Sequence, residues 1–221
     1  VAHSHNARVD VPRIMWPLNI IRSWQTENHA NLFFACSHIA AEWLFPRYRK
    51  VAHVIYNGID LDAFRFDPQI RKQKREELGV SDKTKVIINV GRCTNQKNHS
   101  FILDRAKELK NEDMLFIIIG EGPLFEQLNR RIEDEHISNV RMMGKSFNVF
   151  QWLCAADVFF FPSVYEGLGI VAIEAQACGL RVLSTNTIPV EADMQIGCFE
   201  WIELADIKRW NDLLKQVTYS E

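Results

Sequence analysis

Short, unbroken runs of apolar residues alternate with amphipathic stretches of helical length from residue 86 onward, and this alternation limits the possible folds most strongly. The apolar runs are residues 86–90, 115–119, 140–142, 158–161 and 182–184. Strands that are apolar on both faces are typical of parallel sheets covered by helices on both sides. The pattern therefore predicts an α/β fold with a parallel sheet. Ligands of such folds bind outside the carboxyl ends of the strands.

The first eighty residues carry a less regular version of the same signal. Strand-like runs at residues 1–4, 32–36 and 51–55 are separated by helical stretches at 12–28 and 37–45. A turn signal, Asn-Gly-Ile-Asp at 57–60, precedes a charge-rich stretch that contains Pro68 and is typical of a linker with a solvated helix. We therefore predict a partial α/β domain over residues 1–60, a linker over 61–82 and a second α/β domain over 83–221.

Composition excludes several classes of protein. About half of the 221 residues are hydrophobic (47%) and 24% are charged, as in ordinary globular proteins, and the apolar runs are far shorter than the ~20 residues of a membrane span. The five cysteines form no C-x-x-C pair, which argues against a zinc site or a disulfide framework and favours a reducing cytoplasm. A slight basic excess in residues 1–80 is too small to indicate nucleic-acid binding, although it permits contact with an anionic surface.

The first candidate functional loop follows the apolar run 86–90. Gly91 allows close approach of the backbone to a ligand, and Arg92 and Lys97 are spaced to flank one diphosphate. A guanidinium binds phosphate oxygens through its forked donors, whereas an ammonium acts as a point charge. The alternative is that both residues are solvated loop cations.

The second candidate loop follows residues 158–161 and leads into a helix. Gly167 and Gly169 keep the start of that helix open to a phosphate. Glu166 and Glu174 are eight residues apart, about 12 Å along the axis if all were helical, so that both carboxylates face one wall and accept hydrogen bonds from sugar hydroxyls. Alternatively, Glu166 caps the helix and Glu174 is a surface or satisfied core carboxylate, since an unpaired buried acid is costly.

These motifs together resemble the family-four retaining glycosyltransferases of the GT-B fold, in particular bacterial members that build capsular polysaccharides and exopolysaccharides. The match rests on Val-Gly-Arg at 90–92 with Lys97, on Gly-Glu-Gly-Pro-Leu at 120–124, and on Glu166 and Glu174 as an E-x7-E motif. The resemblance implies a C-terminal Rossmann-like domain that binds the donor and the last units of an incomplete N-terminal Rossmann-like domain on the acceptor side.

The resemblance also implies roles for individual residues. Arg92 and Lys97 match the cations that stabilise the departing diphosphate, Glu166 the acid at the donor sugar, and Glu174 the acid at the ribose. His5 matches a histidine at the donor-sugar cleft, although it is alternatively an ordinary residue at a strand end. The remaining expected donor-binding residues are Gly91, Gly120, Met143, Gly144, Lys145, Gly167, Leu168 and Gly169, of which Met143 to Lys145 would read the base mostly through the backbone.

No cofactor is expected, because such enzymes use a nucleotide sugar as substrate and need no divalent metal. Asp60 and Asp62 imitate a D-x-D metal motif by coincidence, and His3 and His5 lack an acidic third ligand. The expected partners are a nucleotide-diphosphate sugar, UDP-linked by analogy with the family, and a saccharide or lipid-linked acceptor. Residues 12–28 are expected to face the acceptor and the inner face of the membrane, or alternatively to pack as a helix with two core tryptophans.

Two departures from the family pattern concern the ends of the chain. The upstream half-domain with its Gly-rich loop and the terminal helix that returns to it are not in the sequence, so we expect a fragment with little or no activity of its own. Two other functions remain open at this stage. One is a nucleotide-sugar-binding module without catalysis, and the other is a GT-B-shaped nucleotide-sugar epimerase.

Overall fold

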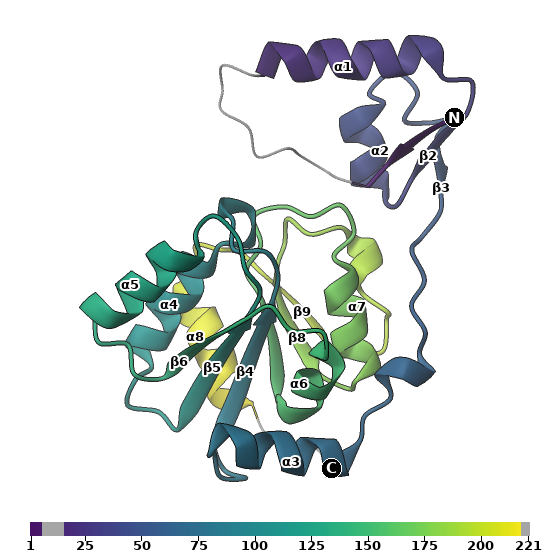
Figure 1. Cartoon of the computed structure of the whole chain (residues 1–221). Coiled ribbons are helices and arrows are strands. Elements are labelled where there is room, and N and C mark those ends of the chain that lie inside the picture. Colours follow the sequence, from purple (N-terminus) through teal and green to yellow (C-terminus); the bar gives the residue numbers. More distant parts are fainter. Residues whose placement is uncertain (6–15, 218–221) are drawn as a thin grey trace. The chain divides into compact units, whose positions relative to one another are not determined.

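The computed structural model describes residues 1–5 and 16–217 and divides the chain into two compact units. The first unit comprises Val1–Ile59 with the short segments Tyr165–Ile170 and Thr187–Ala192. The second comprises Asp60–Val164, Val171–Asn186 and Asp193–Glu221. Each unit is built around its own parallel sheet (Figure 1).

The first unit contains a small three-stranded parallel sheet in the order β1-β2-β3. The elements in chain order are β1 (Ala2–Ser4), α1 (Trp16–His29), β2 (Phe33–Ala35), α2 (His38–Leu44) and β3 (His53–Val54). The helix α2 packs on the sheet, where the Ser4 hydroxyl donates a hydrogen bond of 2.8 Å to the Ala40 carbonyl. The three strands and two helices expected from the sequence are thus confirmed, except that residues 12–15 of the first helix lie outside the described residues.

The second unit has a six-stranded parallel sheet in the order β6-β5-β4-β7-β8-β9. Its strands are β4 (Lys85–Val90), β5 (Met114–Ile119), β6 (Val140–Gly144), β7 (Val158–Phe161), β8 (Arg181–Thr185) and β9 (Phe199–Ile202). Five of these strands were predicted, and β9 was missed. Its helices are α3 (Pro68–Leu78), α4 (His99–Glu108), α5 (Phe125–Asp134), α6 (Val149–Ala155), α7 (Ile170–Ala177) and α8 (Ile207–Gln216). The short 3-10 turns are η2 (Asp62–Phe64), η3 (Asn95–Lys97) and η4 (Val190–Ala192).

Helices cover both faces of the larger sheet (Figure 1). On one face α4, α5 and α8 bury a core in which Phe116, Phe160 and Trp210 are fully inaccessible to solvent. The rings of Phe160 and Trp210 meet edge to face, with centroids 4.9 Å apart. On the other side lie α6 and α7, and this two-sided burial explains why the strands are apolar throughout.

The helix α3 belongs to the second unit, in contrast to the expected linker with a solvated helix at residues 61–82. Its two buried arginines, Arg71 and Arg75, bind the Asp157 carboxylate at 2.6 and 3.2 Å. Arg71 also donates to the Ala156 carbonyl at 2.8 Å, and Asp157 accepts a hydrogen bond of 2.7 Å from the Val86 amide. The helix expected in this stretch is present and its Lys72, Glu76 and Glu77 are exposed, but Arg71 and Arg75 are buried and paired rather than solvated.

The order of the strands reverses between β4 and β7. From β4 the chain proceeds outward to β5 and β6, and from β7 it proceeds in the other direction to β8 and β9. In open parallel sheets ligands bind beside this reversal, outside the carboxyl ends of the strands. The loops that follow β4, β5, β6 and β7 are therefore the part of this unit in which a binding site is expected.

Candidate nucleotide-binding site

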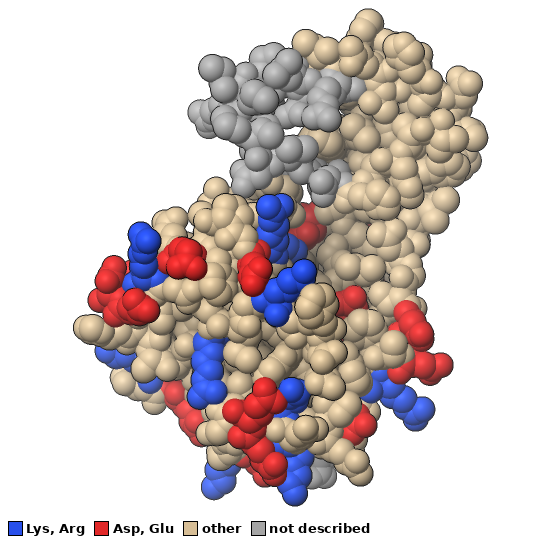
Figure 2. All heavy atoms as spheres, viewed as in Figure 1, with Lys and Arg blue, Asp and Glu red and all other residues tan. Residues whose placement is uncertain are grey.

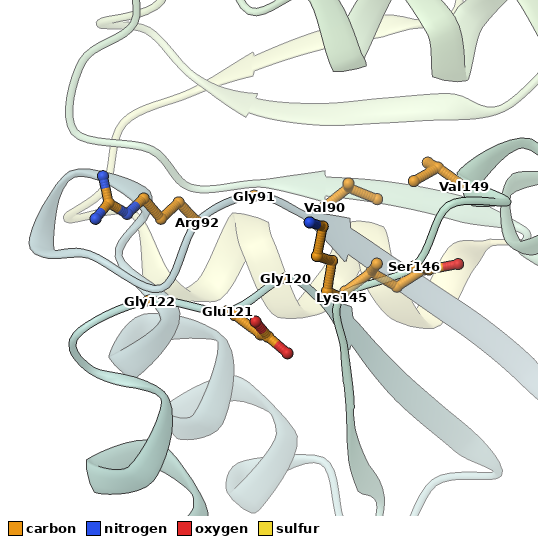
Figure 3. Close-up of a pocket in the computed structure, with 10 residues that line it drawn as sticks. Val90, Gly91, Arg92, Gly120, Glu121, Gly122, Lys145, Ser146 and Val149 are labelled. Atoms are coloured by element: carbon orange, nitrogen blue, oxygen red, sulfur yellow. The ribbon is translucent and has the colours of Figure 1, made fainter.

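A cavity of about 570 Å³ opens at the carboxyl ends of β4, β5 and β6 (Figure 3). This size suits a small-molecule ligand. Three loops and the start of α6 line the cavity: Val90, Gly91, Arg92, Ile119, Gly120, Glu121, Gly122, Lys145, Ser146 and Val149. Figure 3 shows Arg92 and Lys145 projecting from the loops after β4 and β6, and Glu121 from the loop after β5.

Two glycines bring the loops after β4 and β5 into close contact. Gly120 has φ +143°, and a Cβ placed there would lie 2.0 Å from the Gly91 carbonyl oxygen. Gly122 has φ +157°, and its Cβ would lie 2.6 Å from the Cys93 carbonyl oxygen. The Cys93 amide donates to the Glu121 carbonyl at 2.9 Å. The Gly-Glu-Gly motif thus builds the wall of the cavity, since any side chain at either glycine would collide with backbone.

Lys97 is held beside the same wall. Its aliphatic chain crosses Gly91, where an added Cβ would lie 2.8 Å from Lys97 Cε, and its ammonium lies 5.2 Å from the centroid of the Phe161 ring. Val90 and Phe161 end the neighbouring strands β4 and β7. The Lys97 charge is therefore placed at the point where the strand order reverses.

Hydrogen bonds tie the loop after β4 to the loop after β7. The Val164 amide donates to the Gln96 carbonyl at 2.8 Å, and the Asn98 side-chain amide donates to the Pro162 carbonyl at 3.2 Å. Asn98 itself has φ +54°, a left-handed conformation that asparagine tolerates better than most residues. These bonds give the segment that carries Lys97 a defined path at the carboxyl edge of the sheet.

Charges of both signs surround the cavity. Arg92, Glu121 and Lys145 are exposed side chains from three different loops. Figure 2 shows Lys and Arg interspersed with Asp and Glu over the visible face of the second unit. Burial, and then the charge of Glu121, raise the pKa of the Cys93 thiol to about 11, so this cysteine is protonated and unreactive at neutral pH.

The structure brings together only some of the residues predicted for donor binding. Gly91, Arg92, Gly120 and Lys145 line the cavity. Met143 and Gly144 end β6, where the Gly144 carbonyl accepts a hydrogen bond of 2.8 Å from the Gly120 amide. The predicted residues that do not line this cavity are His5, Lys97, Met143, Gly144, Glu166, Gly167, Leu168, Gly169 and Glu174.

The two acids of the E-x7-E motif do not share one helix. The helix α7 begins at Ile170, so Glu166 precedes it, and the helical spacing expected between Glu166 and Glu174 does not apply. Glu166 is buried, with 7% of its surface exposed, and the neighbouring Gly167 carbonyl accepts a hydrogen bond of 2.5 Å from the Ser37 hydroxyl. The loop before α7 is therefore a structured segment of the first unit.

Glu174 lies within α7 and is half-buried. Burial raises the pKa of its carboxyl group. Within the described part of the chain, no group donates a hydrogen bond to this carboxylate. A half-buried acid without a protein donor is a suitable acceptor for hydroxyl groups of a ligand.

Two residue pairs resemble metal-binding motifs in the sequence, namely His3 with His5 and Asp60 with Asp62. The rings of His3 and His5 lie 4.1 Å apart, and burial, followed by the charge of His5, lowers the pKa of His3. Asp60 accepts hydrogen bonds at 3.1 and 3.4 Å from the amides of Asp62 and Ala63, the first two residues of the 3-10 turn η2. The Asp60 side chain therefore has a local structural role.

Sequence reasoning missed part of the cavity. Ser146 and Val149 line it from the segment between β6 and α6, although neither was named. The available signal was their position after an apolar run, the same criterion that identified Gly91 and Arg92.

These features define an α/β unit with a glycine-walled, cation-bearing cavity at the carboxyl ends of its parallel strands, which is the architecture of nucleotide-binding domains. The sequence of residues 70–216 matches the model of the family described as Glycosyl transferases group 1. The match covers more than half of the chain, and the chain belongs to this family. The predicted GT-B type of fold is also confirmed by solved structures.

Three relatives illustrate the similarity. The chain is 30% identical over 193 residues to the putative glycosyltransferase EpsF of Bacillus subtilis (strain 168), which covers 84% of this chain and 50% of that protein. It is 33% identical over 141 residues to the UDP-Gal:alpha-D-GlcNAc-diphosphoundecaprenol alpha-1,3-galactosyltransferase of Escherichia coli, covering 60% of this chain and 36% of that protein. The crystal structure of Anabaena HepE in complex with UDP-glucose superposes with a TM-score of 0.82 at 19% identity, covering 96% of this chain and 60% of that one. The chain thus spans half or less of the two sequence relatives.

The helix α1 carries exposed apolar side chains. Ile20, Ile21 and Trp24 are 66%, 49% and 50% exposed, so Trp24 is not the core residue that one interpretation of the sequence required. Among the described helices, none is long and apolar enough to cross a membrane.

Proposed function

We propose that this chain is part of a retaining glycosyltransferase that moves a sugar from a nucleotide-diphosphate sugar, UDP-linked, to a growing cell-surface polysaccharide or lipid-linked oligosaccharide. The observation that carries the proposal is the cavity at the carboxyl ends of β4, β5 and β6, with Arg92 and Lys145 projecting from its loops. Membership of the glycosyltransferase family supports transfer of a sugar. Support for UDP and for a lipid-linked acceptor comes from the name of the E. coli relative and from the ligand of HepE.

In this proposal the two cations of the loop after β4 bind the diphosphate. Arg92 donates from its forked guanidinium to phosphate oxygens, and Lys97 supplies a point charge at the end of β4. Negative charge develops on the diphosphate as its bond to the anomeric carbon of the sugar breaks, and these cations stabilise it. They take the place of a divalent metal, which the reaction does not require.

The acids bind hydroxyl groups. Glu166 accepts hydrogen bonds from the donor sugar, and Glu174 accepts them from the ribose, a role that its lack of a protein donor within the described chain supports. The backbone of Gly167, Leu168 and Gly169 adds contacts to sugar and phosphate, and His5 lies at the donor sugar. Backbone groups of Met143 to Lys145, at the end of β6, bind the base.

Transfer then proceeds on one face of the sugar. The acceptor hydroxyl oxygen forms a bond to the anomeric carbon on the face that the diphosphate leaves, and its proton passes to an oxygen of the departing phosphate. The configuration is retained, and the electron pair of the broken bond stays with the diphosphate.

The acceptor side of the enzyme is proposed to lie at the inner face of the cytoplasmic membrane. The exposed Ile20, Ile21 and Trp24 of α1 support peripheral contact with lipid, since an apolar helix surface partitions into the headgroup region.

Binding is the direct test, because the chain spans half or less of its relatives and we expect little turnover from it alone. The chain is titrated calorimetrically with UDP-glucose, GDP-mannose and ADP-glucose in the presence of a metal chelator. We expect one of them to bind without metal, and Arg92→Ala or Lys97→Ala to weaken that binding at least about tenfold, about 1.4 kcal/mol. Lys208→Ala, which removes an exposed cation on α8, serves as the control. Unchanged affinity in both loop variants would remove the diphosphate assignment.

A further inference from the structure

Phe147 is the most exposed large apolar side chain in the described part of the chain. It lies between β6 and α6, and 88% of its surface is accessible to solvent. A phenylalanine ring is among the largest apolar groups in a protein, and its transfer from water to an apolar environment is favourable. A ring in this position therefore offers a surface that a ligand can cover.

The ring lies at the rim of the cavity. Lys145 and Ser146, which precede Phe147, and Val149, which follows it closely, all line the cavity. The Lys145 ammonium lies 4.8 Å from the centroid of the Phe147 ring, and Figure 3 shows the Lys145 side chain extending toward the end of β4. Phe147 thus lies beside the lining of the cavity in the chain, and its ring contacts one lining side chain, that of Lys145.

The Lys145 ammonium lies over one face of the ring, and this weak cation–π contact favours one orientation of the aromatic plane. The high exposure of Phe147 leaves its remaining surface open. Apolar side chains, Val149 and Val90, line the cavity beside this rim. A planar, weakly polar group fits between such neighbours better than a charged or hydroxylated one does.

We propose that Phe147 is a stacking platform for the nucleobase of the bound nucleotide, with Lys145 holding the ring in place. This inference rests on the proposed function, since it assigns the base end of the same ligand. Stacking on an aromatic side chain does not read the donor and acceptor pattern of a base, because every base has a π-face. Phe147 therefore supplies affinity for the base without choosing between uracil and guanine, and that choice is left to the backbone at the end of β6.

The test compares ligands with and without a base. The chain and its Phe147→Ala and Phe147→Trp variants are titrated with UDP, GDP and inorganic pyrophosphate. We expect Phe147→Ala to weaken UDP and GDP at least about fivefold and by similar factors, to leave pyrophosphate unchanged, and Phe147→Trp to retain the affinity for both nucleotides. The ring protons of bound uracil should show an upfield ring-current shift in NMR spectra, which Phe147→Ala abolishes.

The matched control is Ile196→Ala, which removes an exposed apolar side chain from a loop that does not line the cavity. Thermal unfolding of Phe147→Ala should match that of the wild type, since the ring is exposed. A Phe147→Ala chain that binds UDP with wild-type affinity, or that loses pyrophosphate equally, overturns the stacking role and leaves the proposed function standing. A wild-type chain that binds neither UDP nor GDP removes both.

Discussion

The aliphatic chain of Lys97 lies directly against the α-carbon of Gly91. A Cβ at Gly91 would approach Lys97 Cε to 2.8 Å and Cδ to 2.9 Å, so the absence of a side chain at residue 91 gives Lys97 its path. The same path brings the ammonium to 5.2 Å from the Phe161 ring at the end of β7. Gly91 therefore determines where the Lys97 ammonium lies, at the point where the strand order reverses.

Gly91→Ala should weaken nucleotide binding with little loss of stability. The added methyl group displaces the far end of a flexible side chain rather than backbone, so the fold accommodates it while the ammonium moves. We expect about a tenfold loss of affinity for UDP by calorimetry and a change of under about 1 kcal/mol in the free energy of unfolding. Gly58→Ala is the control, because nothing lies within 4 Å of its new methyl group. Full affinity in Gly91→Ala would show that the position of Lys97 is not needed for binding.

Gly120→Ala should damage the fold of the second unit. Its φ of +143° is unfavourable for alanine, and the methyl group would lie 2.0 Å from the Gly91 carbonyl oxygen, which cannot rotate away. We expect a loss of more than about 2 kcal/mol in urea unfolding. Gly197→Ala has a positive φ of +80° but open space around the new methyl group, and should lose about 1 kcal/mol. Equal losses in the two variants would contradict the close approach of the loops.

Asp157→Asn should strongly destabilise the second unit. The amide replaces a carboxylate that binds Arg71 at 2.6 Å and Arg75 at 3.2 Å, and it leaves two buried guanidinium groups without their counter-charge. Breaking a buried pair in this way costs about 3–5 kcal/mol. The control is Glu77→Gln, which removes the exposed partner of Lys74 and should change the free energy of unfolding by under about 0.5 kcal/mol. A small effect in Asp157→Asn would mean that the backbone carbonyls around Arg71 suffice.

Glu174→Gln should stabilise the chain at neutral pH. Burial raises the pKa of Glu174 above its ordinary value of 4.5, so folding favours the protonated form and the ionised form costs stability as the pH rises through the folded pKa. We expect a gain of under about 1 kcal/mol at pH 7, limited by solvent screening. The gain should disappear as the pH falls below 4.5 in urea unfolding. An equal gain in the free energy of unfolding at pH 7 and below pH 4.5 would assign the effect to packing rather than to charge.

The same variant tests the proposed contact with ribose. Glutamine keeps an acceptor oxygen but has no charge, so UDP should bind more weakly to Glu174→Gln, while inorganic pyrophosphate should bind unchanged. Equal weakening of the two ligands would move Glu174 away from the ribose.

Five of the six strands of the second unit were predictable because they are buried on both faces. In β5 every residue is buried, which makes an unbroken apolar run that the sequence displays directly. The missed strand β9 lies at the edge of the sheet, where Glu200 is only partly covered and pairs with Arg181 of β8 at 2.8 Å. An edge strand with a paired charge has no apolar run to reveal it.

Part of the cavity was predictable from the rule that ligands bind outside the carboxyl ends of parallel strands. That rule identified Gly91 and Arg92, which follow the end of a buried strand, whereas Gly120 and Lys145 were expected from the family resemblance. It could not relate Glu166 to Glu174, because their spacing indicates a common face only if a helix contains both, and α7 begins at Ile170. The positions of His5, Lys97, Glu166 and Glu174 around a bound donor stay predictions.

The buried arginines of α3 limit where the second unit can be separated from the rest of the chain. A shortened protein that starts at residue 83, where the charge pattern suggested a domain start, would lack Arg71 and Arg75 and leave the buried Asp157 without both of its ion-pair partners. One that starts at Asp60, the first residue of the second unit, keeps the helix with its acidic partner. The second unit therefore includes a helix whose composition is typical of an interdomain tether.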